Sequence, residues 1–261
     1  KDSFQLYMKI YDCFMFFDEE MLLDLRLNIM NKYVDKFVIT EATYLHSGKA
    51  KKLVFDINKF SKFKDKIIYT VVDDLPGNLE KIYDSDNRDK RGEKLINNSI
   101  KRENYQREMA QKSLKNLDPN DFILINDVDE IPNLDNLNLN KIKKKIIMFK
   151  QKTFSYKFNL QYRELNWHGS KACRKKDFIS PQWLRNVKDR KYPFWRIDTF
   201  FSKKKYTGIY YVENGGWHFT NIKSAEDIEK KYTNFLHHQD YEFSGLNIKD
   251  IKSMIKNKKI I

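Results

Sequence analysis

The sequence predicts an α/β domain in which a mostly parallel central sheet is flanked by helices. Short apolar runs rich in β-forming residues alternate with segments of helical periodicity in the first half of the chain. One run, residues 122–125, is apolar at every position, as expected for a strand covered on both faces. The intervals between the runs are typical of βαβ units, whose crossovers connect parallel strands.

The first half of the chain contains the clearest elements. We expect the first strand within residues 6–17, a mixed apolar run rich in aromatic side chains. The acidic residues 18–20 then predict the N-cap and negative first turn of an amphipathic helix. Two further short strands are expected at residues 35–42 and 67–72.

The later elements are less regular. A polar loop is expected at residues 73–94, a polar helix at 99–117 and the central strand at 121–125. Beyond Pro132 the expected elements, in order, are one or two strands within 146–160, a short helix at 180–187, a hairpin at 200–212, a helix at 225–238 and a terminal helix from 248. The terminal segment could lie on an anionic membrane, but we favour a packed helix with a solvated lysine face.

Length and composition fit one folded domain spanning residues 1–261. Hydrophobic residues make up 41% of the 261 positions and aromatic residues 15%, which is enough apolar surface to offset the entropy of ordering. Neither an internal repeat nor a linker interrupts the chain. Cys13 and Cys173 are too few and too far apart to predict a disulfide framework or a zinc site.

The formal net charge of +14 favours anionic partners such as nucleic acid, a membrane surface or phosphorylated small molecules. An AT-rich genome, which raises Lys, Asn and Ile together, is the favoured explanation for most of this excess. No segment has the length of a transmembrane helix and no signal peptide is visible. Because the sequence starts at Lys1, an upstream anchor could have been removed, so the localisation and any membrane association stay open.

A cluster of polar side chains follows directly on the apolar strand. Asp127 and Asp129 are two residues apart, so in an extended chain both would point to the same side, with Asn126 and Glu130 beside them. Two carboxylates on one side suit Mg²⁺ or Mn²⁺, and ligands of open α/β sheets gather at the carboxyl ends of strands. Without a cation, these neighbouring carboxylates would repel one another. The alternative is a polar turn in which an acidic residue caps the helix expected after Pro132.

Five sequence blocks resemble blocks of glycosyltransferase family 17 and occur in the same order along the chain as in that family. The best-known members of the family are the β-1,4-mannosyl-glycoprotein 4-β-N-acetylglucosaminyltransferases. The strongest is Asp127-Val-Asp-Glu-Ile-Pro132, which resembles the metal-binding block of that family. The other four are Tyr11-Asp-Cys-Phe-Met-Phe-Phe17 before the helix with Leu25-Arg26, Phe37-Val-Ile-Thr-Glu-Ala42 with Ser47-Gly-Lys49, Glu103-Asn-Tyr-Gln-Arg107, and Gly216-Trp-His-Phe219.

The resemblance implies a GT-A type nucleotide-diphospho-sugar transferase fold, Mn²⁺ or Mg²⁺ as cofactor and transfer with inversion. It further implies UDP-GlcNAc as the donor and a glycan hydroxyl as the acceptor, with no nucleic-acid partner. Residues 1–132 would form the nucleotide-binding half, and residues 133–261 would complete the acceptor and metal sites. The acceptor and the compartment stay undetermined, because the middle of the chain matches least and the membrane anchor of the eukaryotic enzymes is not in this sequence.

Candidate site residues follow from these blocks and from side-chain chemistry. The expected metal ligands are Asp127, Asp129 and His218. The expected donor-binding residues are Glu41, Lys49, Arg102, Gln106, Arg107 and Asp127. For Glu41, a salt bridge to a nearby lysine is an equally good interpretation. Inverting transfer also requires a general base, for which Asp198, Glu213 and Glu130 are unresolved candidates.

Two other functions are weighed against glycosyl transfer. A nucleic-acid-binding protein would account for the charge, but the lysines are scattered and no known module is recognisable. A carboxylate-metal phosphohydrolase would need more Asp, Glu and His ligands at several strand ends. Four aromatic side chains could stack on sugar rings, although packing in the core is the more common role of each: Trp167, Trp195, Trp217 and Tyr211.

Overall fold

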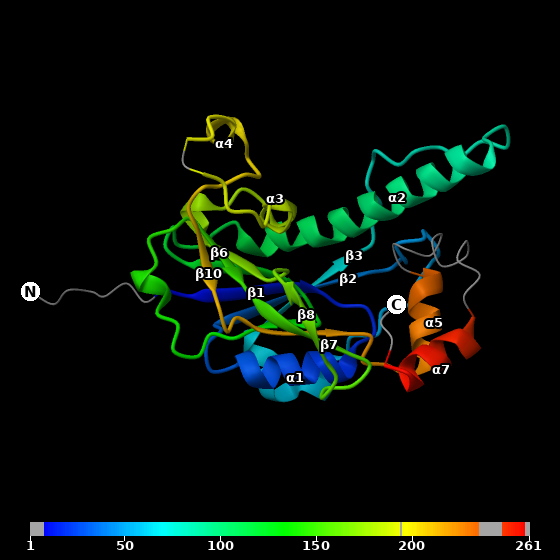
Figure 1. The fold of residues 1–261 in the computed structure, drawn as a ribbon, viewed down its shortest axis with the longest axis horizontal. Helices are drawn as coiled ribbons and strands as arrows, with labels where there is room; N and C mark the ends of the chain where they lie inside the picture. Colours follow the sequence, from blue (N-terminus) through cyan, green and yellow to red (C-terminus); the bar gives the residue numbers. More distant parts are fainter. Residues whose placement is uncertain (1–7, 194, 235–246, 259–261) are drawn as a thin grey trace, which may run out of the picture.

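The computed structural model describes residues 8–193, 195–234 and 247–258. A seven-stranded sheet with strand order β10-β6-β9-β4-β1-β2-β3 forms its centre (Figure 1). The four strands of its parallel half are β1 (Ile10–Met15), β2 (Lys36–Ala42), β3 (Ile67–Val72) and β4 (Phe122–Asp127). The other three are β6 (Ile146–Phe149), the antiparallel β9 (Lys171–Arg174) and β10 (Ile209–Val212). The predicted α/β fold with a mostly parallel central sheet is therefore confirmed.

Helices cover both faces of this sheet. In Figure 1, α1 (Glu20–Met30) runs along one face and the long α2 (Arg88–Glu108) along the other. Successive residues of β4 enter different cores: Leu124 joins the cluster that contains Leu23 of α1, whereas Ile123 and Ile125 join the cluster on the opposite face. The expectation of a central strand buried on both sides is confirmed.

Several short helices occur between the strands and the two long helices. The described 3₁₀ helices are η1 (Ile57–Lys66), η2 (Met109–Leu114), η3 (Leu139–Lys141) and η4 (Lys175–Asp177). The predicted helix at 180–187 is α3 (Pro181–Asn186), whose Ser180 caps the first turn by accepting from the Trp183 amide. Both α3 and η2 pack on the α2 side of the sheet through Leu184 and Leu114.

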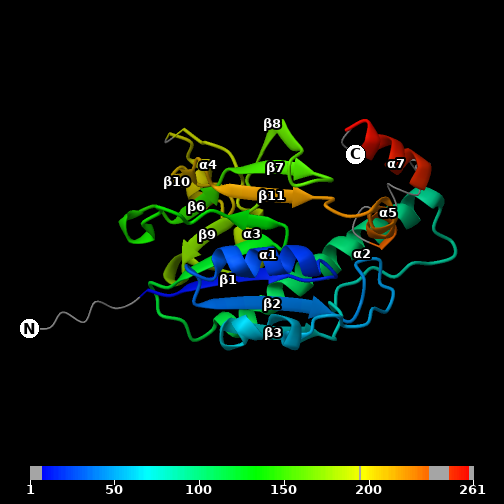
Figure 2. The ribbon, with the colours of Figure 1, turned by 90° about the horizontal axis from the view of Figure 1, so that it is seen from below.

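A second, four-stranded sheet lies beside α1 (Figure 2). Its order is β5 (Glu130–Pro132), β11 (Gly216–Thr220), β7 (Gln151–Ser155) and β8 (Gln161–Trp167). The pairing of β5 with β11 places His218 opposite Glu130, although 88 positions separate them in the sequence. Gly216 has a φ of +117°, and a Cβ there would lie 2.1 Å from the Ile131 carbonyl oxygen, so this close pairing requires glycine.

The C-terminal helices pack against each other. Ile228 of α5 (Ala225–Asn234) and Ile251 of α7 (Ile248–Lys256) are both fully buried in one small apolar cluster. The terminal helix is therefore packed, as favoured from the sequence. Residues 235–238 of the predicted longer helix lie outside the described residues. None of the described helices is long and apolar enough to cross a membrane.

Two predictions of local structure were wrong. Residues 88–94, predicted as loop, form the first turns of α2, which is capped by Asn87 accepting from the Lys90 amide. That part of the helix lacks an apolar stripe, so periodicity could not reveal it. The predicted hairpin at 200–212 is instead the end of α4 (Asp198–Phe201) followed by β10, which pairs in parallel with β6. The apolar residues 209–212 do form a strand, but this strand pairs with β6, which is remote in sequence.

Candidate active site

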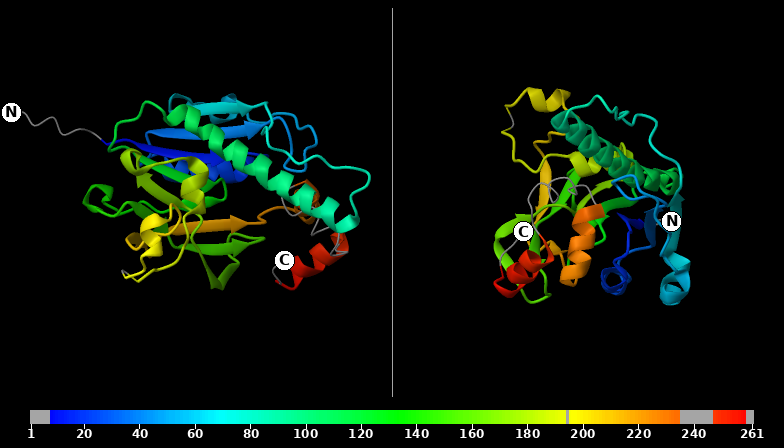
Figure 3. Two further views of the ribbon diagram at one scale, coloured as in Figure 1. Left: turned by 90° about the horizontal axis from the view of Figure 1, so that it is seen from above. Right: turned by 90° about the vertical axis from the view of Figure 1, so that its right-hand side faces the viewer.

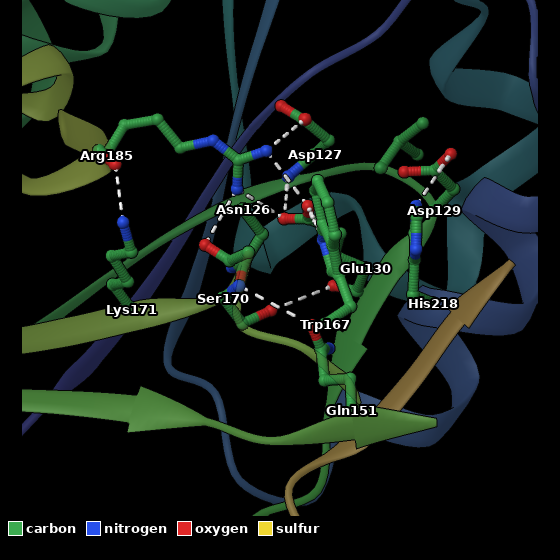
Figure 4. A network of polar contacts seen from close by, with 12 residues as sticks. Asn126, Asp127, Asp129, Glu130, Gln151, Trp167, Ser170, Lys171, Arg185 and His218 are labelled. Atoms are coloured by element: carbon green, nitrogen blue, oxygen red, sulfur yellow. Dashed lines mark hydrogen bonds and ion pairs between the residues drawn. The ribbon is translucent and has the colours of Figure 1, made fainter. Parts of the chain in front are cut away.

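A tight turn separates the two aspartates that follow β4. The strand ends at Asp127, Val128 and Asp129 form the turn, and β5 starts at Glu130. The two carboxylates have different partners, because the turn replaces the extended chain on which the expectation of a shared side rested. Figure 4 shows Asp127 facing Arg185 and Asp129 facing His218.

A buried arginine on α1 fixes the backbone of this turn. Arg26 of α1 donates to the Glu130 carbonyl at 2.5 Å and to the Asp127 carbonyl at 3.2 Å. Its other guanidinium nitrogens bind the Asp12 carboxylate at 2.8 and 2.5 Å, and both side chains are fully buried. Asn126 donates to the same carboxylate at 2.6 Å. The pair thus neutralises a buried charge and satisfies the carbonyls of a turn that has no regular ladder.

Asp127 is held by two guanidinium groups. Its Oδ1 lies 3.1 Å from Arg107 of α2, and its Oδ2 lies 2.6 Å from Arg185 of α3. Burial alone would raise the pKa of this carboxyl, but the charges of Arg185 and Arg107 hold it well below its ordinary value. Both oxygens are therefore used in ion pairs.

Glu130 is the second anchor of Arg185. The guanidinium donates to both Glu130 oxygens at 2.7 and 2.9 Å, and the indole of Trp167 donates at 2.5 Å. Glu130 also accepts from the Asp127 amide at 2.9 Å. Because Glu130 is fully buried and has these partners, it orients the turn and Arg185 (Figure 4). The repulsion expected among neighbouring carboxylates is thus relieved at Asp127 and Glu130 by arginine.

The close approach of Gly169 gives a first prediction. A Cβ at this position would lie 1.8 Å from Glu130 Oε1 and 2.2 Å from Trp167 Nε1. Gly169→Ala would push Glu130 out of its pairing with Arg185, and we expect a loss of roughly 3 kcal/mol in unfolding free energy, measured by urea titration. Gly77→Ala is the control, because nothing lies within 4 Å of its added Cβ. Equal stabilities of the two variants would contradict the prediction.

Asp129 has a different environment. It is 19% exposed, and the ion pair described for it is the contact of Oδ2 with His218 Nε2 at 4.0 Å. Burial raises the pKa of Asp129 to about 6, against the opposing effects of His218 and Lys231. The His218 ring stacks on Trp167 with 4.8 Å between ring centroids, which fixes its plane. Two adjacent aspartates thus have pKa values shifted in opposite directions by their surroundings.

A cavity of about 220 Å³ opens beside this turn, at the carboxyl ends of β1, β2 and β4. Asp127, Val128 and Asp129 form part of its wall, and Lys231 and Tyr232 of α5 form another part. The remaining lining residues are Met15, Phe16, Phe17, Glu19, Ala42, Tyr44, His46, Lys51, Glu103 and Gln106. Apolar walls with a few charged groups are typical of small-molecule sites.

The predicted donor-binding residues have different surroundings. Glu41 is buried, and its oxygens accept from Lys51, the amides of Val54 and Phe55, and the Tyr69 hydroxyl. The salt-bridge interpretation of Glu41 therefore describes the structure, in which this carboxylate holds the loop after β2. Lys49 is exposed and does not line the cavity.

The residues predicted on α2 lie nearer the site. Gln106 lines the cavity, donates to the Thr40 carbonyl at 3.1 Å and contacts His46 at 3.4 Å. Arg102 donates to the His46 carbonyl at 3.1 Å and packs against Gly48, where a Cβ would lie 2.7 Å from its Nη2. The φ of +96° at Gly48 and this contact explain the glycine of the Ser-Gly-Lys loop.

The three candidate bases all lie outside the set of residues that line the cavity. Glu130 is engaged as described above. Asp198 binds Arg196 at 2.7 and 2.8 Å and Lys205 at 2.9 Å on α4. Glu213 is 73% exposed and pairs with Lys150 at 3.0 Å. The choice of base among them stays a prediction.

Sequence reasoning missed Arg185, which pairs with the carboxylates of both Asp127 and Glu130. Its neighbourhood in sequence contains no block that suggested a role, and only the packing of α3 beside β4 brings it to Asp127. Lys51 and Lys231 were also missed among 50 lysines and arginines. Charge alone gave no signal for selecting them.

The sequence profile of glycosyltransferase family 17 matches residues 2–185. The chain belongs to glycosyltransferase family 17. The matched region of this family 17 protein contains the turn at 127–130 and ends at Arg185, whereas His218 and α5 follow it. Membership shows that the protein is a glycosyltransferase, and the family acts with a nucleotide-sugar donor and a glycan acceptor.

No curated protein matches the sequence of this glycosyltransferase. Among solved structures it is similar to one described as "2.76 Angstrom Crystal Structure of a Putative Glucose-1-Phosphate Thymidylyltransferase from Bacillus anthracis in Complex with a Sucrose". The TM-score is 0.36 at 12% sequence identity, and the alignment covers 80% of this chain and 88% of that chain.

Proposed function

We propose that this family 17 glycosyltransferase transfers N-acetylglucosamine, with inversion, from UDP-GlcNAc to a hydroxyl group of a glycan, and that it requires Mn²⁺ or Mg²⁺. The observation that carries the proposal is the contrast at the turn. Asp127 is neutralised by Arg107 and Arg185, whereas Asp129 stands at the cavity wall with His218 4.0 Å away. A carboxylate kept from guanidinium pairing beside a cavity suits a cation.

The residues at the turn fit a divalent metal with two protein ligands. Carboxylate and imidazole are suitable ligands for Mn²⁺, and such ions complete their coordination with water and substrate phosphates. Asp129 and His218 would hold it, and Nδ1 of His218 is buried without a hydrogen-bond partner in the described residues. The described part of the chain contains no group of three or more His, Cys, Asp or Glu side chains that could hold a metal ion, so water and substrate would have to supply the other ligands. A bound metal would neutralise the negative charge of the departing nucleoside diphosphate.

Asp127 would then act by positioning. Its ion pairs orient Arg107 and Arg185 beside the turn, where a guanidinium suits a diphosphate oxygen. Lys51 and Lys231 line the cavity and add positive charge for an anionic donor. We propose that the diphosphate binds between these side chains and the turn.

The lining residues also include two carboxylates that could accept the proton of the acceptor hydroxyl. Glu19 accepts from the amides of Phe17 and Asp18, both at 3.2 Å, and Glu103 pairs with Arg107 at 2.7 Å. We add both to the base candidates, because a base must lie within reach of a bound acceptor hydroxyl. A Gln substitution that leaves kcat unchanged would exclude the residue concerned.

The binding step of the proposal is tested by thermal unfolding in the presence of UDP-GlcNAc, GDP-mannose or CMP-sialic acid, with and without Mn²⁺. We expect UDP-GlcNAc with Mn²⁺ to raise the Tm of the wild type and not that of Asp129→Asn. Asp135→Asn is the matched control, because that aspartate is 60% exposed and pairs with Lys32 outside the cavity. If none of the nucleotide sugars stabilises the wild type with metal, or Asp129→Asn responds equally, the proposal fails.

The raised pKa of Asp129 predicts a pH-dependent stability difference. Its pKa is raised from 3.8 to about 6 on folding, so between pH 4 and 6 the folded state binds the additional proton and stability falls as pH rises. Asp129→Asn lacks this loss. We expect the metal-free variant to match the wild type near pH 4 and to exceed it by up to about 3 kcal/mol at pH 7.

Asp127 has the opposite effect on the pH dependence of stability, and its effect falls in a different pH range. Its lowered pKa stabilises the folded state above the unfolded value of 3.8, and this stabilisation is lost as the pH falls below it. Urea titrations from pH 4 to 8 in the presence of a chelator measure the difference between wild type and Asp129→Asn. A difference that is constant over this range would contradict the assignment to Asp129.

A further inference from the structure

The three most exposed large apolar side chains in the described part of the chain occur close together. Trp195, Ile197 and Phe201 are 68%, 70% and 86% exposed, and the next, Met21, reaches 53%. They belong to α4 and the residues just before it, which stand out from the body of the molecule (Figures 1 and 3). Apolar side chains clustered at such exposure mark an interaction surface.

Positive charge surrounds these side chains. Residues 188–208, here called the α4 projection, contain seven lysines and arginines and two aspartates. Asp189 pairs with His168 at 2.6 Å, and Asp198 pairs with Arg196 and Lys205. Both acidic groups are thus paired within the protein. The exposed cations of the projection are Lys188, Arg190, Lys191, Arg196, Lys203 and Lys204.

The base of the projection is fixed to the fold. The Lys188 amide donates to the Lys204 carbonyl at 2.8 Å, which closes the segment. Trp183 of α3 donates its indole N–H to the Lys203 carbonyl at 2.5 Å, and its ring contacts that of Tyr206 at 6.2 Å. A fixed base presents the apolar tip without a large ordering cost on binding.

We propose that the α4 projection docks this protein on an anionic lipid bilayer. Trp195, Ile197 and Phe201 would enter the headgroup region, where a tryptophan has its apolar body in lipid and its N–H near water. The surrounding lysines and arginines complement the negative surface of such a leaflet. This combination of apolar anchors and cationic flanks is the one by which proteins bind a membrane surface without spanning it.

The position of the α4 projection is compatible with catalysis while the protein is docked on a membrane. In Figures 1 and 2, α4 lies at the opposite end of the molecule from α5, whose Lys231 and Tyr232 line the cavity. Docking through α4 therefore does not cover the α5 side of the site. The proposal is independent of the donor sugar and of the metal, and it holds whichever glycan is the acceptor.

Flotation of the whole chain with vesicles tests the proposal. Vesicles of phosphatidylcholine alone are compared with vesicles containing about 30% phosphatidylglycerol at near-physiological salt. We expect flotation with the anionic vesicles only, and at least about a tenfold loss of partitioning for the combined variant Trp195→Ser, Ile197→Ser, Phe201→Ser. Lys203→Gln with Lys204→Gln is expected to weaken flotation and its dependence on salt.

A matched variant controls for general loss of surface hydrophobicity. Met21→Ser, Leu75→Ser and Ile179→Ser remove three apolar side chains that are 53%, 51% and 48% exposed elsewhere, and this variant is expected to float like the wild type. Circular dichroism and Tm establish that each variant is folded. Undiminished flotation of the α4 variant would overturn the proposal. So would equal loss in the control variant, or tight salt-sensitive binding of DNA or RNA that displaces the vesicles.

Discussion

Asp129→Asn is expected to reduce the rate of sugar transfer from UDP-GlcNAc by about 10³-fold in kcat/KM, which corresponds to several kcal/mol of lost charge stabilisation. The reason is that Asp129 is the carboxylate of the turn that faces the cavity and His218 without a guanidinium partner. The neutral amide keeps the shape of the side chain, so the effect isolates the charge. The measurement is UDP release at saturating acceptor over a range of Mn²⁺ concentrations.

Two comparisons make this result specific. Asp135→Asn should retain full activity, because that side chain pairs with Lys32 away from the cavity. Asp129→Asn should be at least as stable as the wild type without metal, so a loss of activity cannot be attributed to unfolding. Full transfer activity in a stable Asp129→Asn variant would refute the proposed role of Asp129.

Arg26→Met is expected to cause the largest loss of stability, about 3–5 kcal/mol, because it leaves the buried Asp12 carboxylate without its counter-charge. It also removes the donor of the carbonyl contacts at Asp127 and Glu130. For a chain of this size the corresponding drop in Tm is roughly 10 °C. Urea and thermal unfolding measure both quantities.

The control for this prediction lies on the same helix. Glu20 of α1 pairs with Lys59, but the two side chains are 44% and 52% exposed, so Glu20→Gln should cost less than about 1 kcal/mol. Adding Asp12→Asn to Arg26→Met should recover part of the stability, because no unpaired charge then stays buried. If Arg26→Met and Glu20→Gln reduce the unfolding free energy by similar amounts, the buried Arg26–Asp12 pair does not contribute the stability assigned to it.

At the turn, the charged groups that hold the backbone are different from the carboxylate proposed to bind the metal. Arg26 and Arg185 hold the backbone and two of the three carboxylates, while Asp129 is left with an imidazole. Burying Asp129 in this way raises its pKa and reduces stability at neutral pH. Proteins commonly accept such a local loss where a charged group is needed for binding.

Much of the fold could be predicted because its signals are local. The apolar runs of β2, β3 and β4 and the acidic first turn of α1 lie within short segments, and hydrophobic periodicity indicates which faces are buried. The carboxylates after β4 were recognisable for the same reason, as polar residues directly after a buried strand. Family 17 membership was also predictable, from five ordered blocks that are each contiguous in sequence.

The partners of those carboxylates were decided only by the tertiary structure. A tight turn of two residues, Val128 and Asp129, gives the neighbouring aspartates different partners. Arg185 reaches Asp127 across 58 positions through the packing of α3, and His218 reaches Asp129 through the pairing of β11 with β5. The sequence determined which carboxylates end the central strand, because burial and strand length are local properties. Which of them is paired with arginine and which has no guanidinium partner depends on contacts between remote segments, and only the folded chain decides these.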